Sequence, residues 1–280
     1  MAHLKLAKVF FCGMFCTMTQ KEITIPPIPE DGEITTSTHD VNIDGHIVTM
    51  SNTLTQSVHK LNVPAKRLLS YAISKLDSRA EYSPKETETT ITVQQWLRMM
   101  EGVEGYEGKD PYRDMKKALE GLFDAKIIMH YTTPKGHARI KHVRWVSVAE
   151  YCEGEAKVTL CFSRPVLPHL TKLQKSFNSY RLGNVKALRS MYSWRLYELM
   201  NQWKDLGKMK VPLDKLHECL EVPESCKKTF GEMRRRVLAP AINELNRKSN
   251  LVITWEAKRV GKKVAYVWFY FGEKKQTELF

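Results

Sequence analysis

The sequence predicts an α+β protein with two domains in tandem, each combining helices with a small antiparallel sheet. Its 280 residues suit two domains, since about 150 residues is a usual domain size. Charge is divided unevenly: residues 1–171 carry 21 basic and 20 acidic side chains, whereas residues 172–280 carry 23 and 11. One order of elements occurs twice: strand, helix, loop, helix, strand, glycine-containing turn, strand. Because a helix followed by a two-stranded hairpin suits a DNA groove and the adjoining backbone, we interpret this repeat as two tandem winged-helix domains.

We expect a flexible amino-terminal segment at 1–40, a first domain at 41–171 and a second domain at 172–280. Segment 1–40 is rich in Pro, Thr and acidic residues in its later part. The apolar run at 9–16 is too short to span a bilayer, which needs about 20 residues. It resembles a signal peptide, but we favour Met18 over Met1 as the natural start, because we expect a cytoplasmic protein with no membrane partner.

Helical spacing of apolar residues and capping residues place the first elements. In order, we expect a strand or arm at 41–50, a helix capped by Ser51 or Asn52, a helix at 65–75 with Pro64 in its first turn, a strand at 89–92 and a helix at 93–100.

Asp110 and Pro111 have the types preferred at a helix N-cap and first turn. This helix places Met115 on its apolar side and Arg113, Lys116 and Lys117 on the other. Strands at 126–131 and 138–149, joined by a turn with Gly136, form the expected first wing. A strand at 157–162 follows, and 163–179 leads to the second domain. There Asn184 is expected to cap a helix to Trp203, before a strand at 210–211 and a helix at 213–220.

The stretch from Thr229 to Phe271 organises the second domain. Its first part predicts a helix with three consecutive arginines near the front, Arg234, Arg235 and Arg236. On a wheel of about 100° per residue, Arg236 lies opposite the apolar side, Arg235 at its edge and Arg234 within it. The second part predicts strands at 252–257 and 264–271 joined by the basic turn 258–263. This helix and basic wing predict a duplex-binding surface.

The residues do not indicate an enzyme, a cofactor or a metal site. Walker, GxGxxG and HExxH motifs do not occur in the sequence, and His137 and His142 do not have the His-x-His spacing of a nicking initiator. The six cysteines include no CxxC pair, and His217, Cys219 and Cys226 do not make a zinc set. Glu101, Glu104 and Asp110 are better explained as a solvated loop than as an acid–base pair.

Four segments resemble the plasmid replication initiators that bind repeated origin sites called iterons. They are MSNTL at 50–54, RLLSYAI at 67–73, LRSMYSWRLYELM at 188–200 and MRRRVLAPAINELN at 233–246. The resemblance implies plasmid DNA replication initiation and copy control, with monomers binding direct repeats and dimers binding a promoter inverted repeat for transcription autoregulation. It implies that the first domain supplies dimer and backbone contacts and the second the main base-reading helix. Implied partners are the host replication initiator, the replicative helicase and chaperones.

The resemblance assigns base reading to Arg234, Arg235 and Arg236. Charge and position assign DNA backbone contacts to another group of residues. These are Lys228, Arg247, Lys262 and Lys263 in the second domain and Arg113, Lys116 and Lys117 in the first. The alternatives are a winged-helix transcriptional repressor without an initiation role and, less favoured, a protein-interaction module. Direct repeats beside an AT-rich tract near the gene would favour initiation over repression.

Overall fold

The computed structural model describes residues 42–82, 85–107 and 109–274. The expectations for segment 1–40, including the choice between Met1 and Met18, lie outside the described residues. The larger helices and strands in chain order are β1 (Ile47–Ser51), α1 (Asn52–Gln56), α2 (Val63–Ser74), β2 (Glu88–Thr92), α3 (Val93–Met100), α4 (Pro111–Asp124), β3 (Lys126–Thr132), β4 (Ala138–Arg144), β5 (Val146–Cys152), β6 (Lys157–Phe162), β7 (Phe177–Arg181), α5 (Met191–Asn201), β8 (Lys208–Pro212), α6 (Leu213–Cys219), α7 (Glu224–Lys227), α8 (Phe230–Met233), a π-helical segment η8 (Arg234–Leu238), α9 (Ala239–Lys248), β9 (Leu251–Val260) and β10 (Lys263–Glu273).

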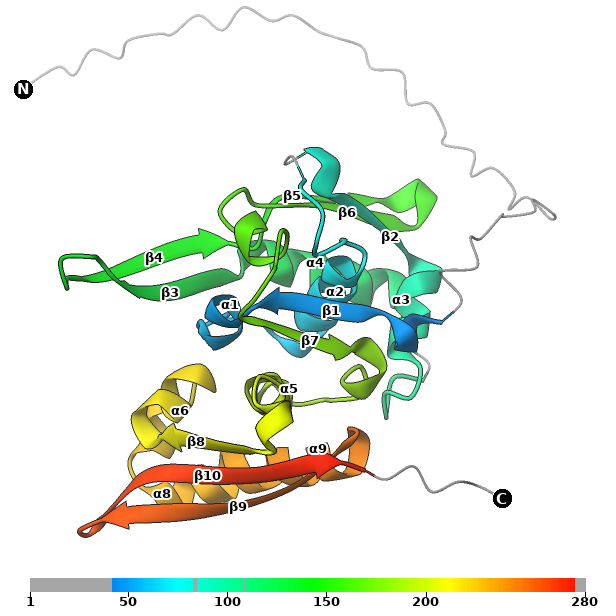
Figure 1. Cartoon of the computed structure of the whole chain (residues 1–280). Helices are drawn as coiled ribbons and strands as arrows, with labels where there is room; N and C mark the ends of the chain where they lie inside the picture. Colours follow the sequence, from blue (N-terminus) through cyan, green and yellow to red (C-terminus); the bar gives the residue numbers. More distant parts are fainter. Residues whose placement is uncertain (1–41, 83–84, 108, 275–280) are drawn as a thin grey trace, which may run out of the picture. The chain divides into compact units, whose positions relative to one another are not determined.

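Two three-stranded antiparallel sheets carry the predicted repeat (Figure 1). In the first, the order is β2-β6-β5; in the second, it is β8-β10-β9. Helices separate the first strand of each unit from its closing hairpin: α3 and α4 in the first unit, and α6, the short α7 and the run α8–α9 in the second. The α+β class is therefore confirmed, and the order of elements is repeated except that the first unit carries the additional hairpin β3–β4. Within the described residues, every helix is too short or too polar to traverse a lipid bilayer.

The expected first wing is wrong in its details. The stretch expected as one strand at 138–149 is two strands, β4 and β5, separated by a bend at Trp145. Among the described residues, β4 pairs with β3 alone, whereas β5 pairs with β6, so the first repeated unit ends at Phe162 instead of Ala149. Trp145 and Val146 are both buried, which breaks the alternation of a half-buried strand. The hairpin β3–β4 is therefore an insertion between α4 and the repeated sheet.

The stretch expected to lead from one domain to the next contributes a strand. β7 lies beyond the expected boundary at residue 171, yet it pairs antiparallel with β1, with Ile47 opposite Arg181. The helix expected from Asn184 begins later, at Met191, because Ser190 Oγ accepts a hydrogen bond from the Tyr192 amide at 3.1 Å. The Asn184 side chain instead donates to the Tyr197 hydroxyl at 3.1 Å.

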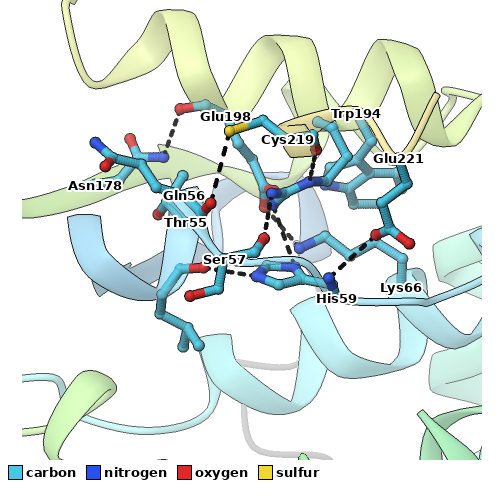
Figure 2. Close-up of polar contacts among 12 residues, drawn as sticks. Thr55, Gln56, Ser57, His59, Lys66, Asn178, Trp194, Glu198, Cys219 and Glu221 are labelled. Carbon is cyan, nitrogen blue, oxygen red and sulfur yellow. Dashed lines mark hydrogen bonds and ion pairs between the residues drawn. The ribbon is translucent and has the colours of Figure 1, made fainter. Parts of the chain in front are cut away.

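A buried charge network centred on α5 connects segments distant in sequence (Figure 2). The Glu198 carboxylate forms ion pairs with the Lys66 ammonium, at 2.7 Å, and with the Arg195 guanidinium, at 3.3 Å. All three side chains are at most 2% exposed. Arg195 also donates to the backbone oxygens of Ser57, at 2.6 Å, and Cys219, at 3.1 Å. The Arg195 guanidinium thus links the segment that follows α1 to the last residue of α6.

His59 completes this network as a neutral imidazole. Its Nε2 lies 2.6 Å from the Leu54 carbonyl oxygen, which can only accept, so Nε2 carries the proton. Its Nδ1 accepts from Arg195 at 3.2 Å. Burial, reinforced by the charges of Arg195 and Lys66, holds the pKa of His59 well below its usual value. The adjacent backbone is fixed by Glu221, which accepts from the amides of His59, at 3.1 Å, and Lys60, at 2.9 Å.

Candidate nucleic-acid interface

The helix that carries the three arginines contains a wide π turn. Thr229 Oγ1 caps its start by accepting from the Glu232 amide at 3.2 Å. After α8, the amide of Ala239 bonds to the Arg234 carbonyl, which is five residues back instead of the usual four. The next residue, Pro240, has no amide proton, and in a regular helix its ring would clash with the carbonyl four residues earlier. The π turn widens the helix at this point and accommodates Pro240.

This turn places all three arginines at the surface. Arg234, Arg235 and Arg236 are exposed, whereas Met233 and Val237 on either side of them are buried. The uniform helical wheel puts Arg234 on the apolar side, where it could be free only by projecting beyond the core, yet the structure exposes it. A π turn holds more residues than an α turn, so it shifts the phase of the wheel and turns Arg234 outward.

Glu232 orients two of the arginines. Both of its carboxylate oxygens accept from Arg235 at 3.0 Å, and one lies 3.9 Å from Arg236. The Arg235 side chain is 72% exposed despite this pair. Within the part of the chain that the structure describes, Arg234 has no ion pair. The trio therefore offers hydrogen-bond donors to a ligand, with Arg235 held in a defined orientation.

The wing is longer and its turn tighter than expected. β9 continues to Val260 and β10 begins at Lys263, so the turn is only Gly261 and Lys262. Gly261 has φ +62°, a conformation that glycine adopts without steric cost. Lys262 and Lys263 are exposed at this tip, and Lys228 is exposed just before α8.

Arg247 has a partner that the sequence did not reveal. Its guanidinium lies 3.5 Å from Glu104, in the loop between α3 and α4. Lys248 lies 3.2 Å and Arg189 3.6 Å from the same carboxylate. The hydrogen bond from Lys248, followed by the charge of Arg247, holds the pKa of Glu104 below its usual value. Glu104 is an exposed loop residue, as expected, and the structure adds that three cations converge on it.

The basic residues assigned to the first domain lie together on α4. Asp110 accepts from the amides of Tyr112, at 3.0 Å, and Arg113, at 3.2 Å, as a helix cap. Arg113, Lys116 and Lys117 are exposed on this helix. Lys116 lies 5.6 Å from the centre of the Tyr151 ring, so its ammonium is partly held by the aromatic face. These three residues belong to a different element from the arginine trio and the carboxy-terminal wing.

Comparisons with known proteins identify the family. Residues 47–201 match the family described as Initiator Replication protein, WH1, and residues 212–271 match Initiator Rep protein, WH2. The chain belongs to the replication initiator family. Its two matched regions confirm the prediction of two winged-helix domains, since WH1 and WH2 follow each other in the chain.

Two relatives extend this result. An uncharacterized 27.6 kDa protein from Escherichia coli is 24% identical over 219 residues, which cover 77% of this chain and 91% of that protein. A crystal structure of the Pi initiator protein in complex with iteron DNA is similar in fold, with a TM-score of 0.69 and 20% identity, and the match covers 84% of this chain and 100% of that one. This family member therefore shares its fold with a protein solved on DNA.

Proposed function

We propose that this initiator starts plasmid replication by binding direct repeats, or iterons, in duplex DNA. Membership of the replication initiator family and the fold shared with the Pi protein, which was solved with iteron DNA, support the proposal. The observation that carries it in this chain is the arginine trio 234–236, exposed on a π turn beside buried Met233 and Val237. An arginine fork suits the O6 and N7 acceptors of guanine in the major groove.

In this proposal, the backbone contacts flank the trio. Lys228, Lys262 and Lys263 contact phosphates next to the groove, because all three are exposed near the helix start or at the wing tip. Arg113, Lys116 and Lys117 do the same from α4. Arg247 contacts phosphate only by sharing or exchanging its pair with Glu104, which makes it the weakest member of this group. Residues 172–280, with 23 basic and 11 acidic side chains, supply most of the electrostatic attraction.

The remaining expectations belong to the same proposal. The first domain, at 41–171, supplies dimer contacts, and the dimer represses its own gene through an inverted repeat. Host initiator, replicative helicase and chaperones are the protein partners.

Footprinting on the DNA that flanks the gene tests the proposal. We expect protection of several direct repeats beside an AT-rich tract. Protection confined to an inverted repeat at the promoter would favour a repressor without an initiation role. If no duplex is protected at moderate salt, the proposal fails and a protein-interaction role takes its place.

A further inference from the structure

The sheet of the second winged-helix unit presents a row of aromatic side chains on its outer face. Along β10, Val267 and Phe269 are buried in the core, whereas Tyr266, Trp268 and Tyr270 alternate with them and remain half-buried or exposed. We call these three residues the aromatic ladder. Successive side chains of a strand point to opposite faces, so the ladder lies on the face away from the core. In Figure 1, α8 and α9 lie behind this sheet.

Lysines border the ladder on both neighbouring strands. On β8, Lys210 is paired with Trp268 and Lys208 with Tyr270, and on β9, Lys258 is paired with Tyr266. Paired residues of antiparallel strands share a face, so these ammonium groups and the rings form one surface. The Lys210 Nζ lies 4.0 Å from the centre of the Tyr266 ring and 5.9 Å from that of Trp268.

The rings are held in a defined geometry. The planes of Trp268 and Tyr270 are 8° apart, with centres separated by 6.1 Å. The Tyr270 hydroxyl donates to Glu256 at 2.8 Å, which fixes the second ring. Glu256 itself pairs with Lys258 at 2.8 Å, and the hydrogen bond from Lys258 holds the pKa of that carboxylate below its usual value. The charges of Glu256 and Lys258 therefore cancel, and Lys208 and Lys210 leave the border of the ladder positively charged.

We propose that the aromatic ladder binds single-stranded nucleic acid. Unpaired bases stack on exposed aromatic rings, and ammonium groups beside the rings attract phosphates, a combination that tolerates any base sequence. A duplex does not fit this surface, because its bases are already stacked inside the helix. A protein partner would gain from the apolar rings but not from the lysines on both sides, so charge complementarity favours the polyanion.

This site is separate from the proposed duplex site. The arginine trio lies on η8, α9 packs against β9, and Leu245 of α9 and Ile253 of β9 are both buried. The ladder faces away from these residues. The inference goes beyond the duplex proposal and does not rest on it, since the three rings of the ladder are not among the residues assigned to the duplex.

Fluorescence anisotropy with a labelled 20-nucleotide oligothymidylate tests the ladder in the full chain. We expect Trp268→Leu to weaken binding by roughly fivefold to a hundredfold, the loss typical of one stacked base. Trp268→Phe, which keeps a flat ring, should retain most of the binding. Trp203→Leu is the matched control, because Trp203 is 45% exposed but lies before β8, outside the ladder.

Duplex binding, measured on the same variants, separates this inference from the proposed function. Trp268→Leu should bind the protected origin duplex as the unchanged protein does, which also shows that it is folded, whereas Arg235→Ala should lose the duplex and keep the oligothymidylate. The inference is overturned if the unchanged protein does not bind the oligothymidylate at low salt, if Trp268→Leu binds it equally well, or if Arg235→Ala alone abolishes that binding. A change of oligomeric state in Trp268→Leu without loss of oligothymidylate binding would make the face a self-interface and also overturn it.

Discussion

Arg235 is the residue best placed to distinguish one base from another. Its side chain is 72% exposed, and its guanidinium is held by both oxygens of Glu232, so it reaches a ligand with little loss of conformational freedom. A good arginine–guanine contact discriminates by roughly 1–3 kcal/mol. We therefore expect Arg235→Ala to weaken binding to the cognate duplex far more than to a random duplex, measured by competition anisotropy. Equal losses on both duplexes would remove Arg235 from base reading.

Lys262 should behave differently, because a wing-tip ammonium contacts phosphate and carries no sequence information. We expect Lys262→Ala to lower the affinity for cognate and random duplexes alike. It should also flatten the dependence of log affinity on log salt by up to about one charge. Lys172→Ala is a suitable control, since Lys172 is an exposed lysine paired with Glu81. If the dependence of log affinity on log salt is the same for Lys262→Ala as for the control, the wing does not contact DNA.

At the scale of the element, Pro240 decides the orientation of the arginines. Replacing it with Ala restores an amide proton and removes the ring clash, so we expect the π turn to relax towards regular α-helix. Arg234 would then rotate towards the apolar side, as the uniform wheel places it, and cognate duplex affinity would fall although the chain gains a helix former. Titration with cognate duplex, together with a crystal structure of Pro240→Ala, checks both parts. Unchanged affinity with a regular helix would show that the π turn has no role in binding.

The elements that local chemistry determines were predictable from the sequence. Asp110 and Pro111 mark a helix start in any context, and the helix and wing at 229–271 follow from spacing and β-branched runs. The failures have non-local causes. The turn of the chain at Trp145 depends on a pocket in which its ring meets His59, with ring centres 4.9 Å apart. Similarly, nothing near Glu104 in the sequence indicates that Arg247 pairs with it.

The arginine trio shows both sides of this limit. Three adjacent arginines at a helix start were visible as a candidate site. The exposure of Arg234 was not, because the wheel assumes a constant angle per residue and the π turn violates it. The aromatic ladder was hidden for a different reason: alternate aromatic residues in a strand are typical of a buried face, and only the sheet shows which side the core occupies.

At the scale of the whole molecule, the buried charges around Glu198 link segments far apart in the chain. Glu198→Gln would leave Lys66 and Arg195 without a counter-charge in a dry site. Breaking a buried pair in this way costs about 3–5 kcal/mol, so we expect the free energy of unfolding in urea to fall by that amount. Glu155→Gln, which breaks an exposed pair with Lys157, should leave it unchanged within error. A small effect of Glu198→Gln would mean that the network contributes little to stability.

The same network predicts a pH dependence. In the folded protein the pKa of His59 lies well below its usual value, whereas in the unfolded chain it is about 6.5. As the pH falls below about 6.5, the unfolded state takes up a proton that the folded state does not, so the free energy of unfolding decreases. We expect His59→Gln to reduce this slope, measured by urea unfolding between about pH 7 and pH 5. His142→Gln, at an exposed position, should keep the full slope.

The pairing of β1 with β7 has a consequence for how such a protein is assembled over evolutionary time. Because Ile47 lies opposite Arg181, the chain enters and leaves the first unit at neighbouring points of one pair of strands. A module whose ends meet can be exchanged, inserted or copied without stretching the polypeptide on either side of it.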